Sequence, residues 1–331
     1  MRWSEIPRCA VACALVLVLS GCAAPGTRAA GVAPGAPSPA LTPSVSLLEQ
    51  TGDLPIERFV AGARRTLDCE IYEVTSQALA DALGAAAQRG VRVRVILEVR
   101  AWSTALVQRE VGVDVLNTPR VDLDHAKSCV RDAAASGAAV LVGTANWSGA
   151  ASSTDADLVM TLPGTDPAAR QVAAVIEADV EGRPVPATAL PTTLHADEVV
   201  VSPYDSRALL SALVQTPATR LLATSEELRD PRLMGLLEEA AGREPVAVAA
   251  PPREATPPGA ARCWSPLYVH AKVFVLWQGS APALAFLGSE NISTQSLDGN
   301  REIGVIVGPP LAGDIANAIA SALQCPGWRA A

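Results

Sequence analysis

Two copies of a histidine–lysine motif are the residues of this chain best suited to chemistry. They are His125-Ala-Lys127 and His270-Ala-Lys272, at an offset of 145 residues. On a strand, residues i and i+2 project from the same face, so each imidazole is expected beside an ammonium group. An imidazole can attack, donate or accept a proton near neutral pH, and an ammonium group attracts anions. The pair therefore predicts a site for reactions of an anionic group.

The repeat continues beyond these motifs at the same offset. The further matched positions are Gly143 with Gly288, Asn146 with Asn291, Ser148 with Ser293, and the acidic pair Asp157 with Glu302. Agreement by chance at six chemically specific positions is implausible. The chain is therefore expected to consist of two related halves, and the bounds we assign are 45–180 and 197–331, joined by a linker at 181–196.

The residues around the motifs predict alternating strands and helices. Strands are expected at 67–75, 91–97, 138–142, 158–162, 219–224, 246–250, 284–287 and 303–307, with helices at 76–89 and 230–241. Strand, helix and strand in succession favour parallel pairing within a layered fold. We predict an α/β protein of two similar halves, each a mixed sheet flanked by helices, packed around a shared active site.

Three sequence elements together resemble the phospholipase D superfamily. They are His125-x-Lys127-x4-Asp132, the repeated Gly-x-x-Asn-x-Ser segments, and Asn300-Arg301-Glu302-Ile-Gly. The resemblance runs from about residue 47 to the C-terminus. It implies a phosphodiesterase in which one histidine forms a phosphohistidine intermediate, while the other protonates the leaving alcohol and then activates water.

The resemblance also implies roles for the matched residues. The groups expected to contact the phosphate oxygens are Lys127, Lys272, Asn146 and Asn291, with Ser148 and Ser293 as further hydroxyl donors. Donors of this kind stabilise the charge that develops on the non-bridging oxygens. No metal ion and no other cofactor is expected.

An acidic partner from the opposite half is implied for each histidine. This pairs Glu302 with His125, and Asp157 with His270. By the same resemblance His125 is the nucleophile and His270 the acid and base, with the reverse assignment left open. Asp132 completes the first catalytic motif, although this aspartate is mainly structural in the family. Trp277 stands where the second motif would have its aspartate, which raises the prospect of an altered substrate.

Several other residues are functional candidates. His195 has no motif around it and is expected to take no part in catalysis. Trp147 and Trp277 either line a lipid or base site or pack in the core. Four arginines follow the first expected helix and form either a groove for nucleic acid or a solvated face: Arg89, Arg92, Arg94 and Arg100.

The N-terminus has the features of an export signal. Arg2 and Arg8 precede a short apolar run at 11–19, and Leu19-Ser20-Gly21-Cys22 follows, which looks like a bacterial lipobox. We predict a signal peptide at 1–21, a lipid on Cys22 and an Ala/Pro/Gly-rich tether at 22–44. An ordinary secretory signal is the alternative. Either way we expect export, and the lipobox predicts a lipid anchor in the bacterial cell envelope.

Four cysteines remain outside the signal and Cys22: Cys69, Cys129, Cys263 and Cys325. An even number in an oxidising compartment favours two disulfides, for which three pairings exist. We favour Cys69–Cys129 and Cys263–Cys325, one within each half. Four buried free thiols are the alternative, and no CxxC pair indicates a metal site.

The charge of the chain bears on its substrate. The formal net charge is -8, which counts modestly against a protein that binds nucleic acid through many phosphate contacts. We predict a phospholipase D-type hydrolase that acts on phospholipids at a membrane, and passage of the same intermediate to an alcohol instead of water would exchange the head group. The alternatives are a nuclease of the same superfamily and a non-catalytic binding module of the cell envelope. A single chain carries both motifs, so a monomer is expected to complete the site.

Overall fold

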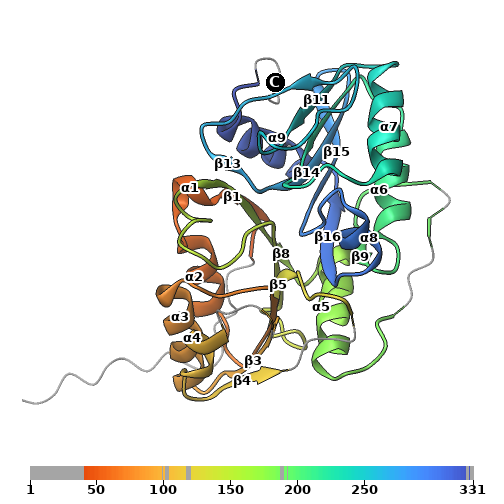
Figure 1. Ribbon diagram of the computed structural model, residues 1–331. Coiled ribbons are helices and arrows are strands. Elements are labelled where there is room, and N and C mark those ends of the chain that lie inside the picture. The colour runs from red at the N-terminus through yellow and green to blue at the C-terminus, as the bar shows by residue number, and fades with distance from the viewer. Residues whose placement is uncertain are drawn as a thin grey trace, which may run out of the picture. The chain divides into compact units, whose positions relative to one another are not determined.

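The two histidine–lysine motifs lie at the central strands of two seven-stranded sheets. The computed structural model describes residues 41–98, 100, 104–116, 121–186, 190–191, 193–325 and 328, and Figure 1 shows the arrangement of their elements. The proposed signal, Cys22 and the tether up to residue 40 lie outside the described residues. Both sheets combine parallel and antiparallel pairs, which confirms the expected mixed α/β fold.

The first sheet contains the first motif. In spatial order its strands are β1 (Ser44–Leu47), β8 (Leu158–Pro163), β6 (Ala139–Gly143), β5 (Lys127–Arg131), β2 (Thr66–Ile71), β3 (Arg92–Leu97) and β4 (Val113–Leu116). Strands β2, β3 and β4 are parallel, whereas β5, β6, β8 and β1 continue the sheet in antiparallel pairs. The motif strand β5 thus lies where the parallel and antiparallel parts of the sheet meet.

The second sheet repeats this plan. In spatial order its strands are β12 (Ala261–Arg262), β11 (Val246–Ala249), β10 (Arg220–Thr224), β14 (Lys272–Gln278), β15 (Ala281–Gly288), β16 (Glu302–Val307) and β9 (Glu198–Ser202). Strand β14 again joins a parallel group, β10 to β12, to an antiparallel group. The sequence repeat is therefore also a repeat of strand order. The proposed linker at 181–196 falls between the last helix of the first half and β9.

Helices cover the sheets in layers. They are α1 (Leu48–Thr51), α2 (Leu54–Ala61), α3 (Gln77–Gln88), α4 (Thr104–Gln108), α5 (Pro167–Val180), α6 (Ser206–Gln215), α7 (Pro231–Ala241), α8 (Thr294–Asp298) and α9 (Leu311–Ala322). One apolar cluster joins α2 and α3 to the first sheet, and another joins α6 and α7 to the second. A third, larger cluster contains side chains of both sheets together with α5 and α9. This shared core holds the two halves together.

Local sequence explains where the main helices begin. Asp230 accepts a hydrogen bond from the backbone N–H of Leu233, and Pro231 occupies the first turn of α7. Asp166 caps α5 in the same way, again with a proline directly after it. An aspartate cap followed by proline satisfies free N–H groups and fixes the backbone for the first turn. These two signals place α5 and α7 firmly after the strands that precede them.

The strand predicted at 67–75 is shorter than expected. β2 ends at Ile71, and the chain then leaves the sheet. The backbone N–H groups of Thr75 and Ser76 both donate to the carbonyl of Trp147, at 2.8 and 2.9 Å. These contacts, and not the hydrogen bonds of a sheet, satisfy the backbone N–H groups of this segment. They turn Tyr72 and its neighbours toward the histidine–lysine motif.

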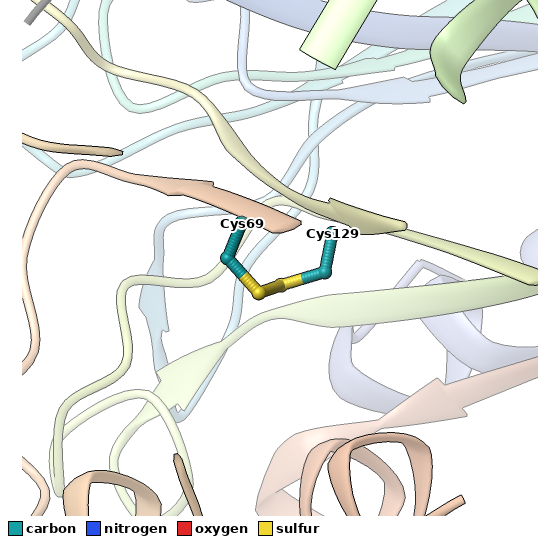
Figure 2. The surroundings of a disulfide bond; sticks show 2 residues. All are labelled: Cys69 and Cys129. Carbon is teal, nitrogen blue, oxygen red and sulfur yellow. A yellow bond between two sulfur atoms is a disulfide. The ribbon is translucent and has the colours of Figure 1, made fainter. Parts of the chain in front are cut away.

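The four cysteines form two disulfides, each within one half. Cys69 on β2 and Cys129 on β5 are cross-strand partners, with Cα atoms 4.1 Å apart (Figure 2). Cys263 is joined to Cys325, which lies beyond α9. This is the pairing favoured from the sequence. The first bridge ties the motif strand β5 to its neighbour inside the apolar core.

The described residues contain no helix that is both long and apolar enough to cross a membrane.

Candidate active site

Each motif histidine lies in an extended segment directly before its strand. Lys127 and Lys272 are the first residues of β5 and β14, and both side chains are fully buried. The ammonium group of Lys127 donates to the carbonyl of His125 at 2.6 Å, and Lys272 donates to the carbonyl of His270 at 2.6 Å. The lysines therefore turn back toward the histidines, as the shared-face argument predicts.

The segment before each histidine pairs with the other half of the chain. The backbone N–H of His125 donates to the carbonyl of Arg301 at 2.9 Å. In the second copy, β13 (Tyr268–Val269) pairs in parallel with β7 (Asp155–Ala156). Since Glu302 follows Arg301 and Asp157 follows β7, this backbone pairing delivers one carboxylate of each half to the histidine of the other.

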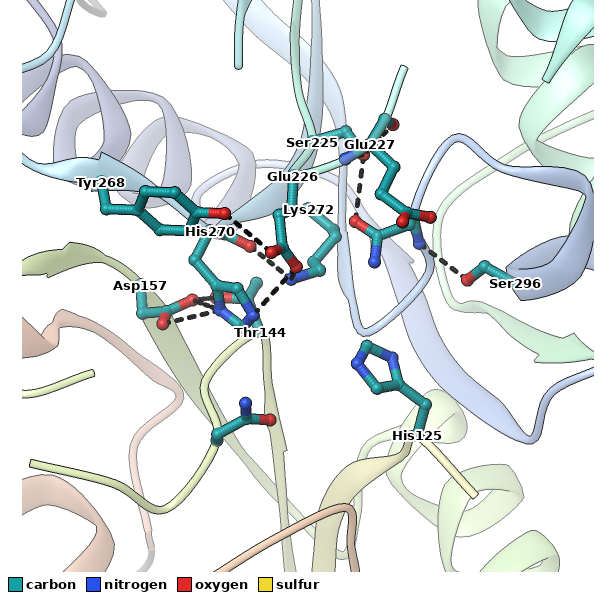
Figure 3. A network of polar contacts seen from close by, with 12 residues as sticks. His125, Thr144, Asp157, Ser225, Glu226, Glu227, Tyr268, His270, Lys272 and Ser296 are labelled. Atoms are coloured by element: carbon teal, nitrogen blue, oxygen red, sulfur yellow. Dashed lines mark hydrogen bonds and ion pairs between the residues drawn. The ribbon is translucent and has the colours of Figure 1, made fainter. Parts of the chain in front are cut away.

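The two carboxylates bind the Nδ1 atoms of the opposite histidines. Glu302 Oε2 lies 2.9 Å from His125 Nδ1, and Asp157 Oδ2 lies 2.9 Å from His270 Nδ1. These are the cross-half pairs that the resemblance implies. A carboxylate at Nδ1 requires a proton there, which leaves Nε2 to face the reaction. Figure 3 shows His125 and His270 approaching the same space from opposite sides.

Both carboxylates are held ionised by their surroundings. Glu302 Oε1 accepts from the hydroxyl of Ser296 at 2.6 Å and the amide of Asn300 at 3.1 Å. Asp157 accepts from the hydroxyl of Thr144 at 2.5 Å. Burial alone would raise the pKa of each carboxyl group, but attraction to its histidine and these hydrogen bonds hold both below their ordinary values. Each can therefore act as a fixed acceptor.

Burial also changes the charge state of the first motif. It lowers the pKa of His125 to about 4, helped by the positive charge of Lys127 and against the attraction of Glu302. It lowers the pKa of Lys127 to about 7, and lowers the pKa of Lys272 as well. A neutral His125 with Nδ1 protonated has a free lone pair on Nε2, as a nucleophile needs.

Glu226 is a site residue that the sequence did not reveal. Its Oε2 lies 3.4 Å from His270 Nε2 and 3.8 Å from Lys272 Nζ, and Figure 3 shows it beside both groups. The hydroxyl of Tyr268 donates to the other oxygen at 2.8 Å. Burial opposes ionisation, but Lys272, His270 and this hydrogen bond bring the pKa of Glu226 to about 2. The site thus contains a third carboxylate.

Tyr72 occupies the matching place in the first half. Tyr72 and Glu226 each lie one residue beyond the position opposite the motif lysine in the strand register. The ring of Tyr72 meets His125 edge-on at 5.0 Å, and Lys127 Nζ lies 5.3 Å from the ring centre. The two halves differ in length before the motifs, so a repeat search at an offset of 145 does not align these residues. Alignment of the strands that precede the motifs would have paired them.

The repeated asparagines and serines lie in turns that follow β6 and β15. Asn146 donates to Glu73 at 3.3 Å, and Asn291 accepts from the hydroxyl of Ser225 at 3.2 Å. The hydroxyl oxygens of Ser148 and Ser293 accept backbone N–H groups three residues later in the chain. The serines therefore shape the turns, which adds a structural function to the phosphate contact expected of them.

The motif predicts Asp132 as a catalytic residue, and the structure corrects this prediction. It lies at the opposite end of β5 from Lys127, roughly 17 Å along the strand. Its carboxylate accepts hydrogen bonds from the backbone N–H groups of Arg64, Arg65 and Thr66 at 2.7 to 3.2 Å. Its backbone φ is 52°, which aspartate tolerates better than most residues. Asp132 anchors the loop before β2 and does not reach the histidines.

Trp277 stands at the equivalent end of β14 and is fully buried. It packs edge-on against Trp328 at 5.6 Å, with the guanidinium of Arg220 4.5 Å from its ring. Trp147 is also buried in the core. Neither tryptophan lines the site, so the departure of the second motif from the family pattern leaves the reacting groups unchanged.

The remaining candidates lie outside the site. His195 is 69% exposed and pairs with Glu198 at 2.9 Å. Arg94 is bound by Asp68 and Arg100 by Glu98, while Arg89 donates to backbone carbonyls of α2. Among the described residues, no group of three or more histidine, cysteine, aspartate or glutamate side chains could hold a metal ion.

Comparison with known proteins agrees with this geometry. Residues 56–180 match the family described as cardiolipin synthase, PLD-like domain. No curated protein sequence is significantly similar to the chain. Residues 56–180 are therefore similar to a PLD-like domain, in agreement with the resemblance of the duplicated motif to the phospholipase D superfamily.

Two solved structures share the fold. Phosphatidylserine synthase from Haemophilus influenzae has a TM-score of 0.60 and 12% identity, with 86% of this chain and 88% of that chain covered. Polyphosphate kinase from Porphyromonas gingivalis has a TM-score of 0.65 and 16% identity, with 84% of this chain covered. The chain spans about half of the kinase, covering 46% of it. At these identities, the likeness is one of fold.

Proposed function

We propose that the protein is a phospholipase D-type hydrolase that removes phospholipid head groups through a phosphohistidine intermediate. The observation that carries the proposal is the pair of histidines whose Nδ1 atoms are bound by carboxylates from opposite halves. That arrangement directs two Nε2 atoms at one substrate. It suits a displacement in which a nucleophile attacks from one side and an acid assists departure from the other.

His125 is the better nucleophile of the two. Its pKa of about 4 keeps it neutral at physiological pH. His270 has a carboxylate near each ring nitrogen, Asp157 at Nδ1 and Glu226 at Nε2. With Nδ1 bound by Asp157, Nε2 of His270 is directed toward the leaving oxygen, the position that a general acid occupies.

The reaction then has two balanced steps. His125 Nε2 attacks phosphorus, the bond from phosphorus to the head-group oxygen breaks, and His270 Nε2 gives that oxygen its proton. Water next attacks phosphorus as His270 takes back a proton, and the phosphorus–nitrogen bond breaks. The products are the free head-group alcohol and phosphatidic acid. Transfer to an alcohol in place of water would exchange the head group.

The buried lysines supply the positive charge for the phosphate. Lys127 and Lys272 each lie beside a motif histidine and within the low-dielectric interior. Ammonium groups placed there before the reaction stabilise charge on the non-bridging oxygens strongly. The asparagines Asn146 and Asn291 are proposed to donate to the same oxygens.

The proposed location is the bacterial cell envelope, with Cys22 carrying a lipid. An anchor would hold the enzyme beside its phospholipid substrate. Arg94 and Arg100 are bound by carboxylates of the protein itself. They are therefore less suited to bind a nucleic acid backbone, which favours a phospholipid substrate. A monomer is proposed, since one chain supplies both histidines.

The test assays the purified protein with EDTA on mixed phospholipid vesicles and on single-stranded DNA, with His125→Ala as control. Phosphatidic acid release that disappears in the variant is the expected result. Cleavage of DNA alone, lost in the variant, would make the protein a nuclease. Equal inactivity of both proteins on both substrates would favour a non-catalytic binding module.

A further inference from the structure

Glu226 is anchored in the site through its outer carboxylate oxygen, Oε1. Tyr268 donates to Oε1 at 2.8 Å, and the exposed Arg253 lies 3.4 Å from the same oxygen while also pairing with Glu254. Oε2 faces inward toward His270 Nε2 and Lys272. The phenol anchors one side of the carboxylate, so the inward oxygen is already in place before substrate binds.

The position of Glu226 is unfavourable for an ordinary anionic substrate. The site has two buried ammonium groups and three carboxylates, on Lys127, Lys272, Glu302, Asp157 and Glu226. Glu302 and Asp157 are matched to the histidines. The carboxylate of Glu226 instead pairs with the ammonium group of Lys272. The substrate phosphate needs the positive charge of the same ammonium group. A phosphodiester brings one more negative charge to the same place, and like charges repel strongly in a poorly solvated site.

A cationic group on the substrate would remove this conflict. Glu226 lies at Nε2 of His270, the atom that gives its proton to the leaving oxygen in the proposed mechanism. When that oxygen takes its place at Nε2, the inward oxygen of Glu226 loses one partner. In that arrangement the inward oxygen of Glu226 is beside the carbon atoms of the leaving alcohol that are nearest to the leaving oxygen. An ammonium group on that alcohol can bind the carboxylate with a charge-assisted hydrogen bond.

We infer that Glu226 is a specificity residue that selects phosphodiesters whose leaving alcohol carries a primary ammonium group, as in a zwitterionic amino-alcohol head group. The inference rests on the proposed function for the identity of the leaving side. The ammonium can donate to Glu226, whereas a quaternary ammonium cannot. In the first half Tyr72 takes the equivalent position, so the preference applies to the His270 side alone.

The experiment compares wild type with Glu226→Gln and uses Glu227→Gln as the matched control. Glutamine keeps the shape of the side chain and can still accept from Tyr268. Glu227 is the next residue, is partly exposed and pairs with Arg229. The substrates are dihexanoyl phosphatidylethanolamine and dihexanoyl phosphatidylglycerol as dispersed monomers, so that membrane surface charge does not enter. The full chain is used, and kcat/KM is measured for each.

Wild type and Glu227→Gln should both prefer the ethanolamine lipid. Glu226→Gln should lower kcat/KM for that lipid about 10-fold to 100-fold, the range expected for loss of a charge-assisted hydrogen bond, and leave the glycerol lipid unchanged or faster. An equal increase in kcat/KM for both lipids would overturn the inference, because Glu226 would then only obstruct substrate binding. Equal slowing of both would overturn it too, because Glu226 would then only support His270.

A binding measurement separates this inference from the proposed function. Calorimetry with O-phosphoethanolamine and glycerol phosphate needs no turnover. Tighter binding of O-phosphoethanolamine that is lost in Glu226→Gln would support the inference even if neither lipid is cleaved, in which case the lipid hydrolase proposal fails alone. No preference in wild type would overturn the inference, and lipid cleavage without such a preference would leave the proposed function standing.

Discussion

Glu302, in the second half of the chain, lies 2.9 Å from Nδ1 of His125, in the first half. Asp157 makes the reverse contact with His270. Neither half therefore contains a complete histidine–carboxylate pair. The site depends on the shared apolar core that packs both sheets around α5 and α9, so the proposed catalysis requires that packing.

Removing either carboxylate should affect a different step. Glu302→Gln leaves His125 without its acceptor, so its tautomer and orientation are lost and formation of the intermediate slows. Asp157→Asn does the same to His270, which slows both protonation of the leaving alcohol and attack by water. We expect kcat to fall about 10²–10⁴-fold in each. Rapid-quench kinetics should show a slower first turnover in Glu302→Gln. Unchanged kcat in both variants would mean that the carboxylates serve only folding.

The nucleophile can be identified by trapping. In His270→Asn the intermediate should form slowly and break down more slowly still, because water has no base to activate it. Alkaline quench and mass spectrometry should then find the phosphorus adduct on the peptide that contains residue 125. His125→Asn should give no adduct. An adduct at residue 270 in His125→Asn, together with no adduct at residue 125 in His270→Asn, would make His270 the nucleophile.

Activity should fall on both sides of a defined pH range. Nucleophilic attack needs neutral His125, so kcat/KM should decrease as pH falls through about 4, where this group is protonated. Phosphate binding needs charged Lys127, so kcat/KM should decrease as pH rises through about 7. The profile of Lys127→Arg should lose the decline above pH 7, because a guanidinium stays charged. A basic limb that persists in Lys127→Arg would assign that limb to another group.

The sequence predicted the parts of this site that repeat at a constant spacing. His125, Lys127 and their copies were found because the motif carries its own geometry on a strand. The cross-half pairing with Glu302 and Asp157 came from the family resemblance, since no local pattern shows which carboxylate meets which histidine. Glu226 was missed because its position depends on where β10 ends and the chain turns.

Asp132 shows the opposite limit. Its place in the motif marks it as functional, and only the structure shows its carboxylate bound to backbone N–H groups far from the histidines. The strand predicted at 67–75 is also shorter in the structure, because the backbone N–H groups of Thr75 and Ser76 donate to the carbonyl of Trp147 and not to a neighbouring strand. Burial and turn contacts of this kind are set by the packed fold and leave no periodic signal.

Asp132 and Trp277 should therefore control stability and not chemistry. Asp132→Ala leaves three backbone N–H groups without their acceptor and should lower the free energy of unfolding by about 2–4 kcal/mol. Trp277→Ala opens a cavity beside Trp328 and should cost about 3–5 kcal/mol. Urea unfolding measures both. At a temperature where each variant is folded, kcat should stay within about twofold of wild type, and a selective loss of kcat in Asp132→Ala would return that residue to the catalytic set.

The disulfide between Cys69 and Cys129 should be the more important of the two for the site, because it joins the motif strand β5 to β2. The double variant Cys69→Ser, Cys129→Ser should lose about 2–4 kcal/mol of stability. Thiol titration of the denatured wild-type domain should find all four of these cysteines oxidised.

The matched variant Cys263→Ser, Cys325→Ser removes a bridge of similar sequence separation, 62 against 60 residues, that does not touch β5. Both variants should be less stable, but only the first should also lower kcat under conditions where it stays folded, since Lys127 begins the strand that the bridge holds. Equal kcat in the two variants would show that the strand is positioned by the sheet and core alone.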